Sequence, residues 1–309
     1  MTSVNSVYRG RFAPSPTGPL HFGSLVAAVG SFLEARTQDG EWLLRMEDVD
    51  QPRCSMAAAT EILRALEAFG FAWNGEVVWQ SRRTEAYATA LERLKAAGRV
   101  FPCSCTRREL ADSAIAPDGA AIYPGTCRAG LPAGREARAW RLRVGDAWIS
   151  FDDAIQGHIV SDLASEAGDF ILLRADGLFA YQLAVVVDDA EAGITHVVRG
   201  ADLLASTARQ IFLQQCLGLA TPEYAHLPVA VNAAGEKLSK QTQAPALDPA
   251  HAAALLASAM RFLGHPLPAE LRAAPLPEFW RWALANWSIA RVPSVRAIFP
   301  GIGMHEGSI

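Results

Sequence analysis

The chain is constrained most by a run near its amino terminus that reads as a strand, a proline-rich turn and a helix. Residues 10–13 are strand-like, three prolines follow, and an apolar segment of helical length spans residues 25–33. The unpaired N–H groups at the start of such a helix point into the turn, where phosphate is a natural ligand. Gly23 lets the backbone approach a phosphate closely, His21 can donate a hydrogen bond to it, and Ser24 is a candidate N-cap. We therefore predict an anion site at this turn; an ordinary helix after a proline-rich connection is the alternative.

Strand-like and helical runs alternate through most of the chain, which predicts an α/β fold with a parallel sheet and helices on both faces. The expected strands after the first are residues 41–45, 77–79, 170–174, 181–187, 195–199 and 227–231. The expected helices after the first are residues 56–69, 84–97, 202–217, 249–263 and 277–287. Because ligands of such sheets bind at the carboxyl ends of the strands, the anion turn and the acidic run at residues 47–50 should share one rim.

The alternation is interrupted between residues 103 and 168. Glycine and proline are frequent there, and the only strand-like runs are short, at residues 140–144 and 148–151. This segment reads as an insertion between two halves of one α/β domain. We therefore expect residues 1–102 and 169–241 to form the two halves of that domain. Residues 103–168 are the insertion, and residues 242–309 are a mainly helical carboxy-terminal part.

Charge and hydropathy exclude two broad classes of protein. The net charge of −4 argues against a general nucleic-acid coating protein, and no apolar run reaches the ~18–20 residues that span a bilayer. The amino terminus lacks the basic and apolar regions of a signal peptide, so we expect a cytoplasmic protein without membrane contacts. Residues 103–143 nevertheless hold seven arginines against four acids, so this stretch either binds a nucleic-acid backbone or forms a solvated charged face.

Lysine is scarce in this chain, and its placement is informative. Of the 28 Lys and Arg residues only three are lysines, and two of these, Lys237 and Lys240, lie in one four-residue stretch of a loop rich in small and polar residues. Nearly all of the other positively charged side chains are arginines, so the pair of lysines indicates that a compact ammonium group is needed in this loop. A solvated surface loop is the alternative.

The cysteines form a cluster in the insertion. The chain has five cysteines, and an odd count in a cytosolic protein argues against a disulfide framework. Three of them, Cys103, Cys105 and Cys127, lie within one stretch of 25 residues. Thiolates bind zinc well, but a closed tetrahedral site needs a fourth ligand, for which the candidates are Tyr123, Glu109, Asp112 and Asp118. Since the insertion has little apolar patterning, we predict one structural zinc ion per chain that supplies the order a core cannot; three free thiols are the alternative.

Several stretches together resemble the signature motifs of class I aminoacyl-tRNA synthetases, and more narrowly of their glutamyl/glutaminyl branch. They are His21-Phe-Gly-Ser24, Arg11-Phe-Ala-Pro-Ser-Pro-Thr-Gly18, Lys237-Leu-Ser-Lys-Gln241, and residues 45–50, 177–189 and 198–203. The resemblance runs from Tyr8 to Leu263 and departs at Ser24, where the family has a second histidine, and at Gln241. It implies a Rossmann-type parallel sheet of the class I synthetase kind, a zinc-bearing insertion that binds the tRNA acceptor end, and a short helical carboxy-terminal part.

The stretch after the lysine loop narrows the resemblance further. Residues 242–309 are too few for the anticodon-binding domain of a glutamyl-tRNA synthetase, so the chain resembles the glutamyl-queuosine tRNA(Asp) synthetases, paralogues without that domain. This implies a monomer that activates L-glutamate with ATP and Mg²⁺, without tRNA, to glutamyl-adenylate and transfers the glutamate to queuosine at the wobble position of tRNA(Asp). A minimal glutamyl-tRNA synthetase that charges the tRNA 3′ end and a catalytically idle tRNA-binding paralogue are the alternatives.

Within this resemblance the phosphates of ATP have expected partners. The helix start, with His21, Gly23 and Ser24, faces the phosphates. Lys240, and less strongly Lys237, neutralises the charge that moves onto the departing pyrophosphate.

Glutamate has expected partners of its own. Arg11 is expected to clamp a carboxylate with its planar fork, and Glu47, at the end of a strand, to pair with the ammonium group. The resemblance supports both roles and adds further residues of the glutamate site: Phe12, Ala13, Pro14, Ser15, Tyr181 and Arg199. It also points to Tyr123 as the fourth zinc ligand.

Overall fold

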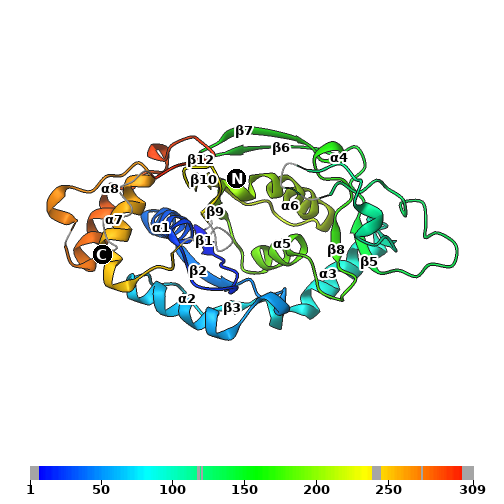
Figure 1. The fold of residues 1–309 in the computed structure, drawn as a ribbon, viewed down its shortest axis with the longest axis horizontal. Coiled ribbons are helices and arrows are strands. Elements are labelled where there is room, and N and C mark those ends of the chain that lie inside the picture. The colour runs from blue at the N-terminus through cyan, green and yellow to red at the C-terminus, as the bar shows by residue number, and fades with distance from the viewer. Residues whose placement is uncertain (1–6, 117–118, 120, 239–244, 273, 301–309) are drawn as a thin grey trace, which may run out of the picture.

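A parallel sheet with helices around it forms the centre of the molecule, as a computed structural model of residues 7–116, 119, 121–238, 245–272 and 274–300 describes it (Figure 1). The first half of the sheet consists of three parallel strands, β1 (Arg9–Phe12), β2 (Glu41–Met46) and β3 (Val78–Trp79). Two helices connect them, α1 (Phe22–Thr37) and α2 (Met56–Ala68). The strand–turn–helix opening predicted from the sequence is therefore confirmed.

The second half of the sheet continues from β1. The N–H of Thr195 donates to the carbonyl of Arg9 (3.0 Å), which places β9 (His196–Gly200) beside β1. Next to β9 run the parallel strands β10 (Glu223–Leu227) and β6 (Trp148–Asp153), and β7 (Gly157–Asp162) closes this edge antiparallel to β6. The predicted parallel sheet is confirmed, and the β6–β7 hairpin of the segment expected as an insertion extends it.

A second, antiparallel sheet carries the cysteine-bearing segment. It has the order β4 (Val100–Cys103), β5 (Ala139–Leu142) and β8 (Ile171–Leu173). The runs expected as strands at residues 140–144 and 170–174 are therefore strands, but they pair with each other here rather than with the parallel sheet. Short 3₁₀ helices lie in the connections of the chain, at Gln51–Arg53, Gln80–Arg82, Arg108–Leu110, Ala201–Leu203, Pro249–His251, Ala269–Leu271 and Ile289–Arg291.

The expectation of a strand at residues 181–187 is wrong, because this run lies in helix α5 (Tyr181–Glu191). The helix packs against α3 (Thr84–Ala96) and α6 (Leu204–Leu217), and every residue from 183 to 189 is buried. An apolar run that is buried on all sides shows neither the period of a strand nor that of an amphipathic helix, so the sequence could not distinguish the two. One further short helix, α4 (Leu163–Glu166), follows β7.

The strand expected at residues 227–231 is divided in two. β10 ends at Leu227, and Pro228, which has no N–H to donate, separates it from β11 (Val229–Ala230). β11 pairs in parallel with β12 (Ala297–Ile298) near the end of the described chain. The carboxy-terminal segment is thus attached to the same part of the molecule as the lysine loop.

The carboxy-terminal part is helical, as expected, and packs on α1 through α7 (Ala252–Phe262) and α8 (Leu276–Asn286). The ring of Phe32 on α1 meets Trp42 of β2 and Trp280 of α8 edge to face, with centroids 5.2 and 5.0 Å away. The indole N–H of Trp287 donates to the buried Glu34 carboxylate of α1 (2.6 Å). These contacts hold α1, whose first turn faces the site described below. Among the described residues, no helix combines the length and the apolarity needed to cross a membrane.

We predict that Phe32→Ala lowers the free energy of unfolding by about 3–5 kcal/mol, because it empties the junction between α1, the sheet and α8. Urea unfolding followed by tryptophan fluorescence measures the loss. The control is Phe299→Ala, which removes the same ring from an exposed position and should change the stability by less than about 0.5 kcal/mol. Equal losses in the two variants would show that this junction does not hold α1.

Candidate functional site

A cavity of about 650 Å³ opens at the carboxyl ends of β1, β2, β9 and β10. It brings together nearly all of the residues predicted to bind ATP and glutamate, which come from segments more than two hundred positions apart. Those that line it are Arg11, Phe12, Ala13, Pro14, Ser15, His21, Gly23, Ser24, Glu47, Tyr181, Arg199 and Lys237. Lys240 lies outside the described residues. Of the acidic run expected at the same rim as the anion turn, Glu47 lines this cavity, whereas Asp48 and Asp50 do not.

The first turn of α1 forms one wall of the cavity. His21, not Ser24, is the N-cap: its Nδ1 accepts from the backbone N–H of Ser24 at 3.4 Å. The prediction of Ser24 as the cap is wrong because the helix begins at Phe22, three residues before the expected start at residue 25. The side chain of Ser24 still lines the cavity.

Gly23 lies where the lysine loop approaches this turn. A Cβ atom at Gly23 would lie 3.1 Å from the His21 ring and 3.5 Å from the carbonyl oxygen of Leu238. Beyond the loop, the N–H of Leu247 donates to the carbonyl of Leu20 (2.9 Å). The two segments thus meet at Gly23 and face the same cavity, and the contact that a Cβ atom would make too close is the one with the His21 ring.

A buried ion network borders the cavity, and two of its members, Arg11 and Glu47, line it. Arg11 places its Nε 3.2 Å from Oδ1 of Asp189 on α5, and Nη1 of Arg45 lies 2.6 Å from the same oxygen. Nη2 of Arg45 also donates to Glu47 (3.2 Å). The fork of Arg11, which the sequence assigned to a ligand carboxylate, is thus partly engaged by a protein carboxylate. The sequence analysis did not predict Asp189 as a site residue. The feature that could have indicated it is the pair of acids, Asp188 and Asp189, at the end of an apolar run.

The two carboxyl groups of this network differ in proton affinity. Burial raises the pKa of Glu47 more than Arg45 and Arg11 lower it. For Asp189, burial also favours the neutral form, but the guanidinium groups of Arg11 and Arg45 outweigh it and lower the pKa. Glu47 lines the cavity with one neighbouring arginine within hydrogen-bond distance, so it is the acid with the greater need for a further cationic partner.

Arg199 and Tyr181 lie beside each other in the cavity wall. Nη1 of Arg199 is 3.5 Å from the Tyr181 hydroxyl, and both line the cavity. Burial, and secondarily the charge of Glu47, raises the pKa of Tyr181, so its hydroxyl stays protonated and able to donate. Away from the cavity, Nη2 of Arg199 donates to Thr207 (2.7 Å) and Nε to His226 (3.1 Å).

The described part of the lysine loop is tied to the cavity rim. Nζ of Lys237 lies 2.5 Å from Oδ2 of Asp202, in the 3₁₀ turn after β9, and both residues line the cavity. Asp202 is a further residue that the sequence analysis did not single out.

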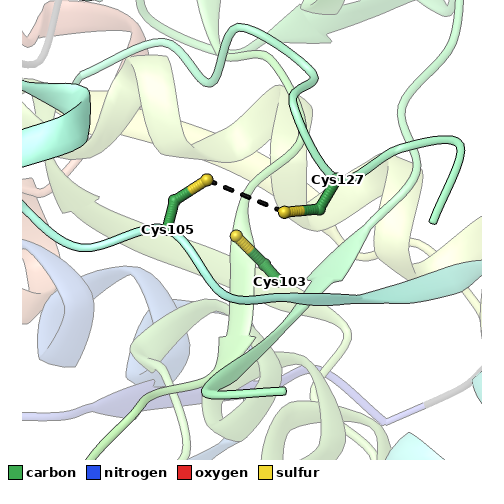
Figure 2. Close-up of side chains that lie close together, drawn as sticks. All are labelled: Cys103, Cys105 and Cys127. Atoms are coloured by element: carbon green, nitrogen blue, oxygen red, sulfur yellow. Dashed lines mark hydrogen bonds between the residues drawn. The ribbon is translucent and has the colours of Figure 1, made fainter. Parts of the chain in front are cut away.

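The three cysteines expected to bind a metal come together between β4 and the turn that contains Cys127 (Figure 2). Their Sγ atoms all lie within 4.8 Å of one another, and Cys105 and Cys127 are 3.7 Å apart, as the dashed line in Figure 2 marks. Zinc–sulfur bonds of about 2.3 Å in a tetrahedron would place two sulfurs about 3.8 Å apart. The thiols therefore have a separation that suits such a metal.

Among the candidates that the structure describes, Tyr123 is the oxygen donor beside this cluster. Its hydroxyl lies 3.5 Å from Sγ of both Cys103 and Cys105. Glu109 is turned toward Arg135 and Thr106 instead, Asp112 is exposed, and Asp118 lies outside the described residues. Arg141, which the sequence analysis missed, donates to Sγ of Cys103 (3.4 Å) and covers the Tyr123 ring, its Cζ 4.0 Å from the centroid.

The proton affinity of Cys127 also suits a ligand. Burial disfavours its thiolate, but hydrogen bonds from Tyr123 and Ser104 outweigh burial and lower the pKa of Cys127 to about 7. A thiol with this pKa releases its proton to solvent readily at neutral pH, and the thiolate can then bind a metal cation.

Comparison of the sequence with known protein families identifies the family of this chain. Residues 7–249 match the family described as "tRNA synthetases class I (E and Q), catalytic domain". The chain belongs to this family. Proteins named glutamyl-Q tRNA(Asp) synthetase from Dechloromonas aromatica and Aromatoleum aromaticum are 63% and 62% identical to it, over 94% and 95% of this chain and 97% and 93% of their own lengths. The family resemblance expected from the sequence motifs is confirmed.

A solved structure shows the same fold over most of this chain. Glutamate-tRNA synthetase from Elizabethkingia anophelis superposes with a TM-score of 0.77 at 25% identity, and the match covers 94% of this chain and 68% of that one. The class I synthetase fold expected from the sequence is confirmed by this likeness together with the parallel sheet.

Proposed function

We propose that this chain activates L-glutamate with ATP to glutamyl-adenylate, without tRNA, and transfers the glutamate to queuosine at the wobble position of tRNA(Asp). The observation that carries the proposal is the meeting of the α1 turn and the lysine loop at one cavity that also holds Arg11, Glu47 and Arg199. The names of relatives at 62–63% identity support the choice of glutamate and of queuosine-bearing tRNA(Asp). A cytoplasmic location and a monomeric state remain predictions from the sequence.

The charges in the cavity suit glutamate, which carries one ammonium and two carboxylate groups. Glu47 would pair with the ammonium, while Arg11 and Arg199 approach from different strands and would each hold a carboxylate. Tyr181 and Ser15 add hydroxyl donors between them. Charge-assisted hydrogen bonds of this kind contribute about 1.5–3 kcal/mol each, enough for one arginine to favour glutamate over glutamine tenfold to hundredfold.

The phosphate chemistry needs alignment and positive charge rather than a protein nucleophile. The substrate carboxylate attacks the α-phosphate of ATP, the bond to the β-phosphate breaks, and pyrophosphate leaves as its Mg²⁺ complex. The free N–H groups of the α1 start, with His21, would hold the phosphates. Lys237 at the cavity rim, and Lys240 from the same loop, would neutralise the charge that develops on the leaving pyrophosphate.

Two measurements test this function. Glutamate-dependent exchange of labelled pyrophosphate into ATP, without tRNA, is expected of the activating enzyme; its absence would favour an idle tRNA-binding paralogue. Charging of queuosine-containing tRNA(Asp) with labelled glutamate, followed by nuclease digestion, should place the label in the anticodon loop. Label on the 3′-terminal adenosine would instead identify a minimal glutamyl-tRNA synthetase.

We predict that Lys240→Ala lowers the exchange rate by about 10²–10³-fold, because it removes a cation that stabilises the transition state more than the ground state. The thermal unfolding temperature should stay unchanged. Lys95→Ala is the matched control: Lys95 is the one lysine outside the loop, it pairs with Glu92 on α3, and its loss should leave exchange unaffected. Near-normal exchange in the Lys240 variant would refute the assignment.

We further propose that the cysteine cluster holds one structural zinc ion, with Cys103, Cys105, Cys127 and Tyr123 as ligands. The separation of the thiols, the position of the Tyr123 hydroxyl and the pKa of Cys127 support it. The described segment around the cluster contributes few buried apolar residues apart from Phe101, Tyr123 and the cysteines themselves. A metal would therefore supply the cross-link that orders it.

We predict that the purified protein contains one zinc per chain by mass spectrometry and that Cys105→Ser loses it. Tyr123→Phe should retain zinc but release it faster to a chelator, because three thiolates remain. The control Cys216→Ser changes a cysteine of α6 and should keep the metal. A wild-type protein purified without chelators that contains no zinc would contradict the site.

A further inference from the structure

Two buried residues that do not line the cavity, His226 and Asp153, form a hydrogen-bonded pair that contacts the guanidinium group of Arg199. His226 on β10 and Asp153 on β6 are both fully buried, and Oδ2 of Asp153 lies 2.5 Å from Nδ1 of His226. On its other side, Nε2 of His226 lies 3.1 Å from Nε of Arg199 on β9. Three adjacent strands thus carry a continuous chain of carboxylate, imidazole and guanidinium that ends at the cavity wall.

The partners of Asp153 determine where the protons are. Its Oδ1 accepts from the backbone N–H groups of Ile155 (3.0 Å), Gln156 (2.9 Å) and His226 (3.1 Å). Its Oδ2 accepts from His226, so the Nδ1 atom carries a proton. Nε2 faces the N–H of Arg199, which can only donate, and must therefore be the unprotonated acceptor.

His226 is accordingly neutral. Burial lowers its pKa to about 4; the charge of Arg199 acts in the same direction, and Asp153 opposes it without prevailing. Thr207 completes the arrangement, because its hydroxyl accepts from Nη2 of Arg199 (2.7 Å) and lies 3.0 Å from Nε2 of His226. Two nitrogens of the guanidinium are thereby fixed, and the third, Nη1, is left beside Tyr181 at the cavity.

We propose that Asp153 and His226 are positioning residues, which hold Arg199 in the orientation that selects the side-chain carboxylate of the amino acid substrate over an amide. This rests on the proposed activation of glutamate. Asp153 acts by fixing the tautomer of His226, and His226 acts by accepting from Nε of Arg199, so that the guanidinium cannot rotate away from the cavity. Neither residue touches the substrate.

The variant Asp153→Asn tests this mechanism. The amide oxygen can keep the three backbone donors, but the amide nitrogen then points at Nδ1 and donates to it. The ring must shift its proton to Nε2, which faces the Nε–H of Arg199, and two donors repel each other. Asp152→Asn is the matched control: it makes the same chemical change one residue earlier, at an exposed carboxylate that pairs with His158.

In pyrophosphate exchange, we expect Asp153→Asn to raise the KM for glutamate roughly tenfold to a hundredfold. A rise of this size corresponds to the loss of one well-placed charge-assisted hydrogen bond. The KM for ATP should be unchanged, and the preference for glutamate over glutamine should fall by a similar factor. Asp152→Asn should match the wild type. An unchanged KM for glutamate, or an equal rise for ATP, would overturn the proposal.

A second measurement uses the wild-type protein and does not depend on the folding of a variant. Long-range ¹H–¹⁵N spectra at pH 7 should show His226 as the neutral tautomer protonated on Nδ1. An imidazolium, or a proton on Nε2, would overturn the positioning role whatever the kinetics show. Wild-type protein without glutamate-dependent exchange would instead overturn the proposed function, and with it the choice of carboxylate, while the spectrum would still report the tautomer.

Discussion

The rest of the structure depends on a buried ion network in which Asp189 of α5 joins Arg11 of β1 and Arg45 of β2. Buried charges are costly unless each has partners, and breaking one such pair by removing a partner costs about 3–5 kcal/mol. The neighbouring Asp188 extends the network, because it accepts from Gln80, Arg83 and Tyr87. These contacts connect the first half of the sheet to the helices of the second half, so the two can assemble only in the arrangement that satisfies the charges. Arg11 and Glu47 of this network also line the cavity, so the contacts that join the two halves of the sheet also shape the cavity wall.

The cavity has its form because the carboxy-terminal helices and the lysine loop contact α1. The carboxy-terminal helices fix its middle through Trp280 and Trp287, and the approach of the lysine loop at Gly23 fixes its first turn. A helix held in this way keeps its N–H groups aimed at the cavity before any ligand arrives. Preorganised donors of this kind need no rearrangement when charge develops in the reaction, which is why they are effective in phosphate chemistry.

The charged side chains that face the cavity are oriented by polar and charged groups of the protein, most of which do not face it. Arg11 is held by Asp189, Lys237 by Asp202, and Arg199 by Thr207 and His226. Long cationic side chains lose considerable freedom when they bind a ligand, and partners that fix them beforehand reduce that loss. In the cysteine cluster Arg141 is placed comparably, against Cys103 and the ring of Tyr123.

The sequence alone determined the strand–turn–helix opening, the parallel sheet, the cysteine cluster and nearly half of the residues that line the cavity, because each of these depends on local periodicity or on a short motif such as Arg11–Gly18. Only the tertiary structure decided that residues 181–187 are helical, since a run buried on all sides shows no period. It alone showed that His21 caps α1, that Asp189 engages Arg11 from 178 positions away, and that Asp153 and His226 support Arg199. Such partnerships depend on which strands become neighbours, and no local pattern of residues records that choice.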